Sequence, residues 1–98
     1  MRRAGALTFS AELLPIDLAI RDWARRDQGV AERLRRVDNR RMTYLRELFG
    51  EICGDEEETE ARSMLAFTLA IGHHFIAADH GHRSHEEALA LAADWLMA

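Results

Sequence analysis

Hydrophobic residues recur at helical intervals of three, four and seven along nearly the whole chain, and no run alternates apolar and polar residues long enough to form a strand. Pro15 is tolerated in the first turn of a helix, so we predict that a first helix begins there and ends at the charged run 25–27. Its predicted inner stripe is Ile16, Ile20, Trp23 and Ala24. The pattern predicts an all-helical fold.

A second helix is predicted from Asp27, a good N-cap residue, to a stop at Gly54. One side of this helix is apolar throughout, with Val30, Leu34, Val37, Tyr44, Leu45, Leu48 and Ile52. The opposite side is charged and offers two ion pairs at helical spacing, Glu32 with Arg36 and Asp38 with Arg41.

The third predicted helix covers residues 56–79, with Asp55 as its N-cap and Glu58 placed to close a capping box. Between Met64 and Ala78 this segment is apolar on nearly every side, so all of its sides should be covered. A chain of this length cannot easily surround its own third helix, and we therefore expect another chain to supply part of the cover.

The last predicted helix begins with a capping motif, Ser84 followed by Glu87, and runs to the chain end. Its main apolar face is formed by Ala88, Leu91, Ala92 and Trp95, and Leu89 and Leu96 extend that face. The sequence thus predicts about four helices in total.

Length and composition fit one compact domain, since the chain has 98 residues, 48% of them hydrophobic, with a single Pro. No stretch is apolar for long enough to cross a membrane, and no signal sequence is recognisable. The only cysteine, Cys53, cannot form an internal disulfide. These features predict a soluble, cytoplasmic protein without a membrane partner.

The formal net charge of −4 is distributed unevenly. Residues 21–46 contain nine Arg and four acidic residues, whereas residues 47–98 contain two Arg and eleven acidic residues. An acidic C-terminal half disfavours binding to nucleic acid there, because phosphate contacts need local positive charge. The arginines of the second helix alternate with acids, which is typical of a solvated, ion-paired face.

Two stretches resemble a known family. Residues 16–27 (IDLAIRDWARRD) followed by residues 37–49 (VDNRRMTYLRELF) resemble the C-terminal regulatory domain of TetR-family transcriptional regulators. The order in which residues 60–65 (EARSML) lead through Gly72 to residues 75–81 (FIAADHG) and a capped final helix is also similar to that family. The resemblance covers about residues 14–98.

The resemblance implies an all-helical domain for effector sensing and dimerisation, whose last two helices pair with their two-fold mates in a four-helix bundle. It also implies a second copy as a partner and, in a full-length regulator, a small apolar effector whose binding releases DNA. TetR-family regulators carry an N-terminal helix-turn-helix that this sequence lacks, so direct DNA binding is not expected from this chain. Residues 1–13 are predicted to be a disordered segment or the remnant of a helix, and residues 14–98 the regulatory domain.

On this basis, four aromatic side chains are candidates to line an effector pocket: Trp23, Tyr44, Phe49 and Phe67. At helical spacing the same residues fit a plain core. The candidate dimer interface lies on the small-residue side of the third helix and on the last helix: Ala66, Ala70, His73, Ala77, Leu89 and Leu96.

The sequence offers little chemistry. It contains no glycine-rich phosphate loop, no nucleophile elbow and no carboxylate pair among apolar neighbours, so we predict neither an enzyme nor a bound cofactor. Cys53 is expected to fill space. Five histidines lie between residues 73 and 85, but His73 and His74 point about a hundred degrees apart on a helix, and we predict no metal site. The alternative hypothesis is a stand-alone helical dimer that binds a metal through this His-rich turn.

Overall fold

The structure is a computed structural model that describes residues 14–98, and the predicted N-terminal segment 1–13 lies outside the described residues. Four α-helices make up most of it: α1 (Leu14–Ala24), α2 (Gln28–Gly50), α3 (Glu56–Gly72) and α4 (His85–Met97). A short 3₁₀ helix, η2 (His73–Phe75), follows α3 directly. Over residues 14–98 there is no strand, which confirms the predicted all-helical fold.

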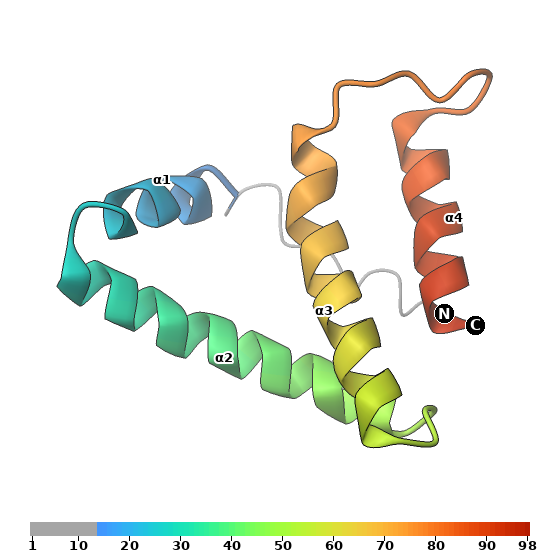
Figure 1. The fold of residues 1–98 in the computed structure, drawn as a ribbon. Coiled ribbons are helices and arrows are strands. Elements are labelled where there is room, and N and C mark those ends of the chain that lie inside the picture. The colour runs from blue at the N-terminus through green and yellow to red at the C-terminus, as the bar shows by residue number, and fades with distance from the viewer. Residues whose placement is uncertain (1–13) are drawn as a thin grey trace.

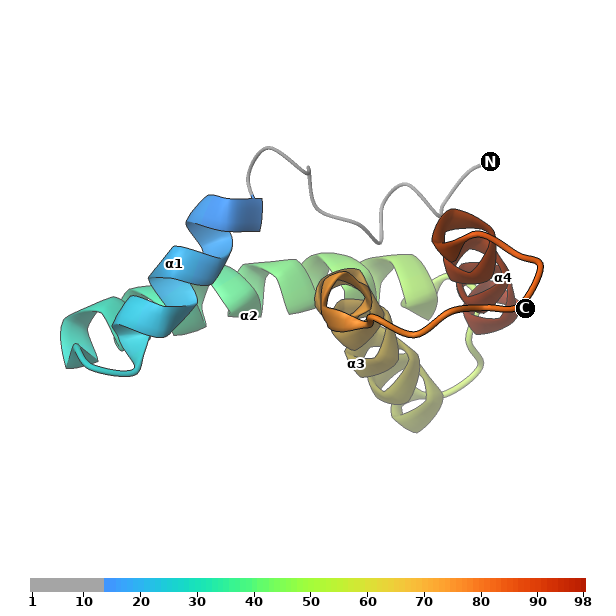
Figure 2. The same cartoon turned by 90° about the horizontal axis from the view of Figure 1, so that it is seen from above.

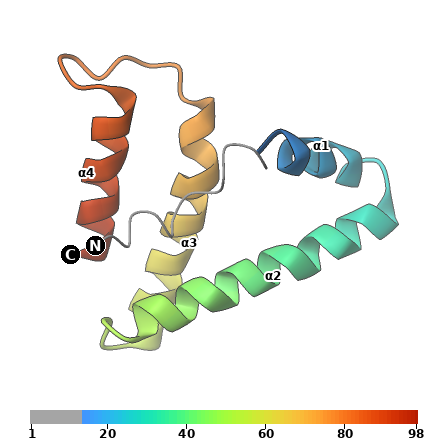
Figure 3. The same cartoon turned by 180° about the vertical axis from the view of Figure 1, so that it is seen from behind.

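The helices form an open, flat arrangement rather than a closed bundle. The long helix α2 carries α1 on its first half and crosses α3 near its other end, and α4 returns beside α3 in the opposite direction (Figures 1 and 3). Seen from above, α1 and α4 lie at opposite ends of the molecule (Figure 2). The principal extents are 39 × 36 × 19 Å, so α3 and α4 have neighbours on only some of their sides.

The N-caps predicted for the second, third and last helices form in the structure. The Glu58 side chain, which was predicted to close a capping box at α3, instead accepts a hydrogen bond from Arg62 at 3.0 Å. The Asp27 carboxylate accepts a hydrogen bond from the backbone N–H of Val30, and the Asp55 carboxylate accepts one from that of Glu58. At α4, the Ser84 hydroxyl and the Glu87 side chain satisfy each other's backbone N–H groups in a complete capping box. Each cap satisfies N–H groups that have no partner inside the helix.

The prediction of a helix over residues 56–79 is wrong at its C-terminal end. The α-helix stops at Gly72, tightens into η2, and the backbone at Ile76 is already extended. Glycine is among the poorest helix formers, and 3₁₀ turns are common at helix ends. Ala77 therefore lies in the connection to α4, where Gly81 adopts a positive φ of 70° that favours glycine.

The core lies where α2, α3 and α4 meet. Its buried members are Leu45 and Phe49 from α2, Ala66 from α3 and Ala93 from α4. Further apolar side chains pack against them while partly exposed: Met42, Cys53, Phe67, Leu69, Leu96 and Met97. Phe49 is the largest fully buried side chain in the part of the chain that is described. The core is small, and it leaves many large apolar side chains uncovered.

The predicted inner stripe of the first helix is wrong. Ile16 and Trp23 are 57% and 54% exposed, and among residues 15–24 the buried position is Asp17. The reason is an ion-pair network between α1 and α2: Arg21 bonds to Asp17 and, through two N–H groups, to Asp38, each at 2.9 Å. Arg41 adds a bond to Asp17 at 3.3 Å. Charged side chains therefore form the best buried contact between α1 and α2, while Ile20 and Trp23 of the predicted stripe stay exposed along the same pair of helices.

Of the two ion pairs predicted along the second helix, one forms. Arg41 lies 3.4 Å from Asp38, as predicted, whereas Glu32 pairs with Arg35 at 3.5 Å instead of with Arg36. Both spacings place side chains on the same helix face, so the choice between them depends on side-chain conformation. Across residues 14–98, no helix has the length and apolar character that crossing a membrane requires.

Candidate functional site

The four aromatic residues proposed for an effector pocket do not surround one cavity. Phe49 is fully buried in the core, and Phe67 is partly buried and packs against it. Tyr44 is 52% exposed on α2, and Trp23 is 54% exposed on α1. Tyr44 and Phe49 are five residues apart, which turns their side chains about 140° from each other around the helix. The plain-core interpretation fits Phe49 and Phe67.

Trp23 instead lines a groove between α1 and α2 with a volume of about 260 Å³. The groove is mostly apolar, and its lining is Ile20, Trp23, Val30, Leu34 and Val37 with the charged residues Asp17, Arg33 and Arg41. A mostly apolar hollow with a few polar groups is the usual form of a small-molecule site. Of the predicted effector residues, only Trp23 lies there.

Two of the charged residues that line this groove, Asp17 and Arg41, are paired with each other. The Asp17 side chain is only 10% exposed and takes hydrogen bonds from both Arg21 and Arg41. The pKa of the Arg21 guanidinium is raised, mainly by its hydrogen bonds to Asp38 and despite partial burial, so the cation is held firmly. Arg33, by contrast, is exposed at the groove. The hydrogen bonds of Asp17 to Arg21 and Arg41 therefore restrain the charged side of the groove.

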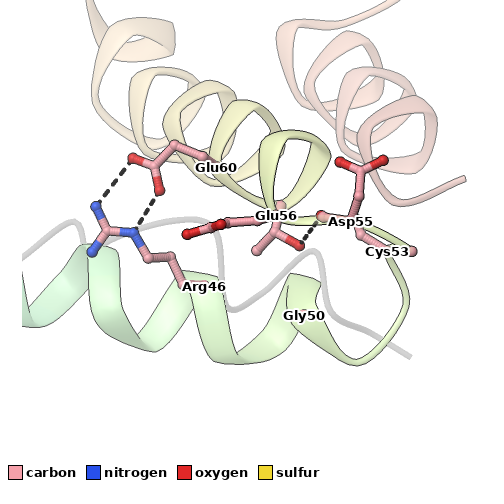
Figure 4. A pocket seen from close by; sticks show the side chains of 8 residues that line it. Arg46, Gly50, Cys53, Asp55, Glu56 and Glu60 are labelled. Carbon is pink, nitrogen blue, oxygen red and sulfur yellow. Dashed lines mark hydrogen bonds and ion pairs between the residues drawn. The ribbon is translucent and has the colours of Figure 1, made fainter.

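A second hollow lies where α2 turns into α3, and it is wide open, with charged and polar residues forming most of its lining (Figure 4). Its volume is about 630 Å³, and it is lined mainly by Arg46, Cys53, Asp55, Glu56, Thr59 and Glu60. Arg46 and Glu60 form a two-bond ion pair at 2.7 and 3.1 Å, which lowers the pKa of the Glu60 carboxyl. Asp55 is engaged as the α3 cap. The Arg46–Glu60 ion pair and the Asp55 cap therefore stabilise the turn between α2 and α3.

The residues predicted for the dimer interface face mainly into the protomer. Ala66 and Ala70 are 0% and 3% exposed, covered by helices of the same chain. Leu96 packs against the core from α4, and Leu89 is likewise half-buried. His73 is half-buried and contacts His85, while Ala77 is exposed after the end of the helix. In this conformation, the small-residue side of α3 is an internal packing surface.

The structure shows instead that α3 and α4 each have a second, outward apolar side. On α3, Met64 and Leu65 are 59% and 57% exposed, and on α4, Leu91 and Trp95 are 45% and 81% exposed. Phe75 and Ile76, just after α3, are exposed as well. We call Met64, Leu65, Leu91 and Trp95 the outer apolar side chains. The sequence pattern could have indicated this second apolar side, since residues 85–97 have apolar residues on opposite sides of the helix.

Histidines from three places gather where α3 ends and α4 begins. The Nδ1 atom of His73 lies 3.2 Å from the Nε2 atom of His85, and the ring of His74 lies 3.9 Å from that of His73. The ring of His80 lies 5.5 Å from that of His85. The periodicity did not predict this contact, because the third helix was expected to continue past His73. Within residues 14–98, no group of three or more His, Cys, Asp or Glu side chains is arranged to hold a metal ion.

No protein-family model matches the chain, and neither a curated protein nor a solved structure matches it. The fold and the exposed surfaces are thus the basis for a functional interpretation.

Proposed function

We propose that this chain is a dimerisation and ligand-sensing domain of the kind found at the C-terminus of TetR-family regulators. The observation that carries the proposal is the pair of outward apolar sides on α3 and α4. The resemblance described above implies that the last two helices pair with those of a second copy. The outer apolar side chains lie on these two helices and are exposed.

Exposure on this scale favours an interface. Single exposed apolar residues are ordinary, but a group of large ones on neighbouring helices marks a surface that associates. Trp95 is the most exposed of them at 81%, and tryptophan is enriched among residues that dominate binding energy. In α4 the inner side is already used by Ala93 and Leu96. The outer side, with Leu91 and Trp95 at 45% and 81% exposed, is therefore the less covered one and is available to a partner.

A second copy fits this surface better than a different partner does. Residues 63–78 contain no Asp, Glu, Lys or Arg, so two such stretches can meet without bringing like charges together. The acids of α3 are concentrated in its first turn, at Glu56–Glu58. A two-fold axis lets one patch cover its own copy and closes the assembly at two chains.

The oligomeric mass tests this proposal. At 11.2 kDa per chain, the wild-type protein is expected to sediment at twice that mass. Leu91→Glu places a charge on the outer side of α4 and should give the monomer mass with an unchanged helical circular dichroism spectrum. Ala90→Glu is the matched control, because Ala90 is exposed on the same helix but turned about 100° away. A monomeric wild-type chain at high concentration, or a dimeric Leu91→Glu variant, would contradict the proposal.

The sensing part of the proposal rests on the groove beside Trp23. Its apolar lining and the exposed Arg33 suit a small, mostly apolar molecule that carries an anionic group. We expect anilinonaphthalene sulfonate to quench Trp23 fluorescence in a Trp95→Phe chain, where Trp23 is the remaining tryptophan. Leu34→Arg would fill the groove with a charge and should abolish this quenching. Equal quenching with and without the substitution would remove the groove as a ligand site.

A further inference from the structure

We propose that His73 and His85 form a proton-sensitive clasp that holds the end of α3 to the start of α4 and opens when both imidazoles are protonated. The contact joins two helices through residues twelve positions apart, with Nδ1 of His73 and Nε2 of His85 at 3.2 Å. At the other end of the helix pair, the Arg62 guanidinium donates to the backbone carbonyl of Leu96. The clasp therefore fixes one of the two ends of the α3–α4 pair.

The chemistry of the pair sets the condition for opening. Two neutral imidazoles share one N–H between the facing nitrogens, and a pair with one added proton still has a donor and an acceptor. When both rings are protonated, the facing nitrogens are both donors and both rings are positive. No hydrogen bond is then possible between them, and two like charges remain at contact distance.

The surroundings of His73 oppose its protonation. Its other ring nitrogen, Nε2, is buried and has no hydrogen-bond partner among residues 14–98, so an added N–H there would be unsatisfied. Burial lowers the pKa of His73 most, and the neighbouring His74 and His85 lower it further. The neutral form of His73 is therefore built into the folded state.

The groups that face the clasp come from every element around it. His74 stacks on His73 from η2, and His80 of the connection lies beside His85 with its own Nε2 buried and unpartnered within the described residues. His85 is the first residue of α4, and two acids of the same turn, Glu86 and Glu87, follow it. The Glu87 carboxylate accepts a hydrogen bond from the Ser84 backbone N–H. The nearby chain also carries Asp79, His82 and Arg83, all exposed.

Opening the clasp would loosen the helices that carry the outer apolar side chains. This regulatory consequence rests on the proposed dimer, whereas the clasp itself does not. In an acidic medium, we expect the α3–α4 pair to separate at its His end and the dimer to weaken. Because opening requires protonated His73, whose pKa is lowered from 6.5, the clasp should open on the acidic side of the ordinary histidine range.

The titration of His73 in the full chain tests the clasp directly by nitrogen-15 NMR of the imidazoles. Replacing His85 by Gln removes one ring that lowers the pKa of His73, so the His73 midpoint should move upward toward its ordinary value. His82→Gln is the control, because His82 is exposed and should leave that midpoint unchanged. An unmoved His73 midpoint in His85→Gln would overturn the proposal.

A second measurement follows the opening itself. Amide protection of residues 88–91, corrected for intrinsic exchange, should be lost progressively in the wild type as the pH is lowered from about 7.5 to about 5, because protonation of both rings removes the contact. The same fall in His85→Gln would overturn the clasp, since that variant has no imidazole pair to separate. The oligomeric mass, measured by sedimentation at both pH values, tests the dimer and not the clasp. A chain that is monomeric at both would refute the dimer and would leave the titration as the test of the clasp.

Discussion

Two serines of this chain should respond to alanine substitution with opposite signs. Ser63 lies on α3 in the core, fully buried, and its hydroxyl has no hydrogen-bond partner among the described residues. A buried polar group without a partner costs about 1–3 kcal/mol. Alanine is also a better helix former than serine, by a few tenths of a kcal/mol. Ser63→Ala keeps the Cβ atom and removes this cost. We expect the free energy of unfolding to rise by about 1 kcal/mol after allowance for the small void.

Ser84 provides the matched comparison. It caps α4, accepting from the Glu87 backbone N–H at 3.0 Å, and it belongs to a complete capping box. Loss of an N-cap side chain costs about 1 kcal/mol, so Ser84→Ala should be destabilising by that amount. For a domain of this size, 1 kcal/mol corresponds to about 4–8 °C in Tm. The two variants should therefore melt on opposite sides of the wild type.

Thermal and urea unfolding followed by circular dichroism would measure both variants. All samples should have one protein concentration, because self-association makes Tm depend on concentration. A lower Tm for Ser63→Ala would refute the reasoning, since it would mean that the buried hydroxyl has a stabilising partner. An unchanged Tm for Ser84→Ala would show that α4 does not need its cap, and the helix would then have to be held by packing alone.

Three further predictions concern charge and association. Asp17→Asn removes the carboxylate shared by Arg21 and Arg41, and it should lower the free energy of unfolding by about 1.5–3 kcal/mol. Asp22→Asn breaks an exposed ion pair with Arg26 and should change the free energy of unfolding far less. Equal losses in urea titrations would contradict the role of the network. The pKa of His73 is lowered from its ordinary 6.5, so as the pH falls the imidazole of the unfolded chain takes up its proton before that of the folded chain. The stabilisation from neutral His73 should therefore be complete above about pH 6.5 and be lost as the pH falls through the pKa of His73 in the folded chain. Urea midpoints that do not fall with pH, or that fall equally in His73→Gln, would show otherwise. Trp95→Ser should make the free energy of dimerisation less favourable by about 2–4 kcal/mol for each side chain lost, because Trp95 is the most exposed of the outer apolar side chains. Trp23→Ser should leave the dimer unchanged, and sedimentation of both variants would measure the difference.

Much of the fold could be predicted because it is local. The caps Asp27, Asp55 and Ser84 were predicted from residue type and spacing alone, and each forms in the structure. An N-cap needs only a side chain and backbone groups two or three residues away, so no distant contact decides it. The end of the third helix was harder to predict, because the apolar pattern continues past Gly72 whereas the α-helical conformation of the backbone ends there.

The candidate sites were predicted less well, for a physical reason. Trp23 lies in a groove, whereas Phe49 lies in the core, and both had the same apolar character at helical spacing. Spacing alone gives the side of a helix on which a residue lies, but not which neighbour covers that side. The contact between His73 and His85 depends on where two helices end, which the pattern around either residue does not contain.

By itself, the sequence determined the helical class, the start of each described helix after the first, and the separation of a basic middle from an acidic C-terminal half. Only the tertiary structure decided that Asp17 is buried while Ile16 and Trp23 are exposed, and which of the two apolar sides of α4 faces inward. Helix caps and periodicity are set by residues within one or two turns of each other. Burial is set by the crossing of α2, α3 and α4, which joins residues far apart along the chain.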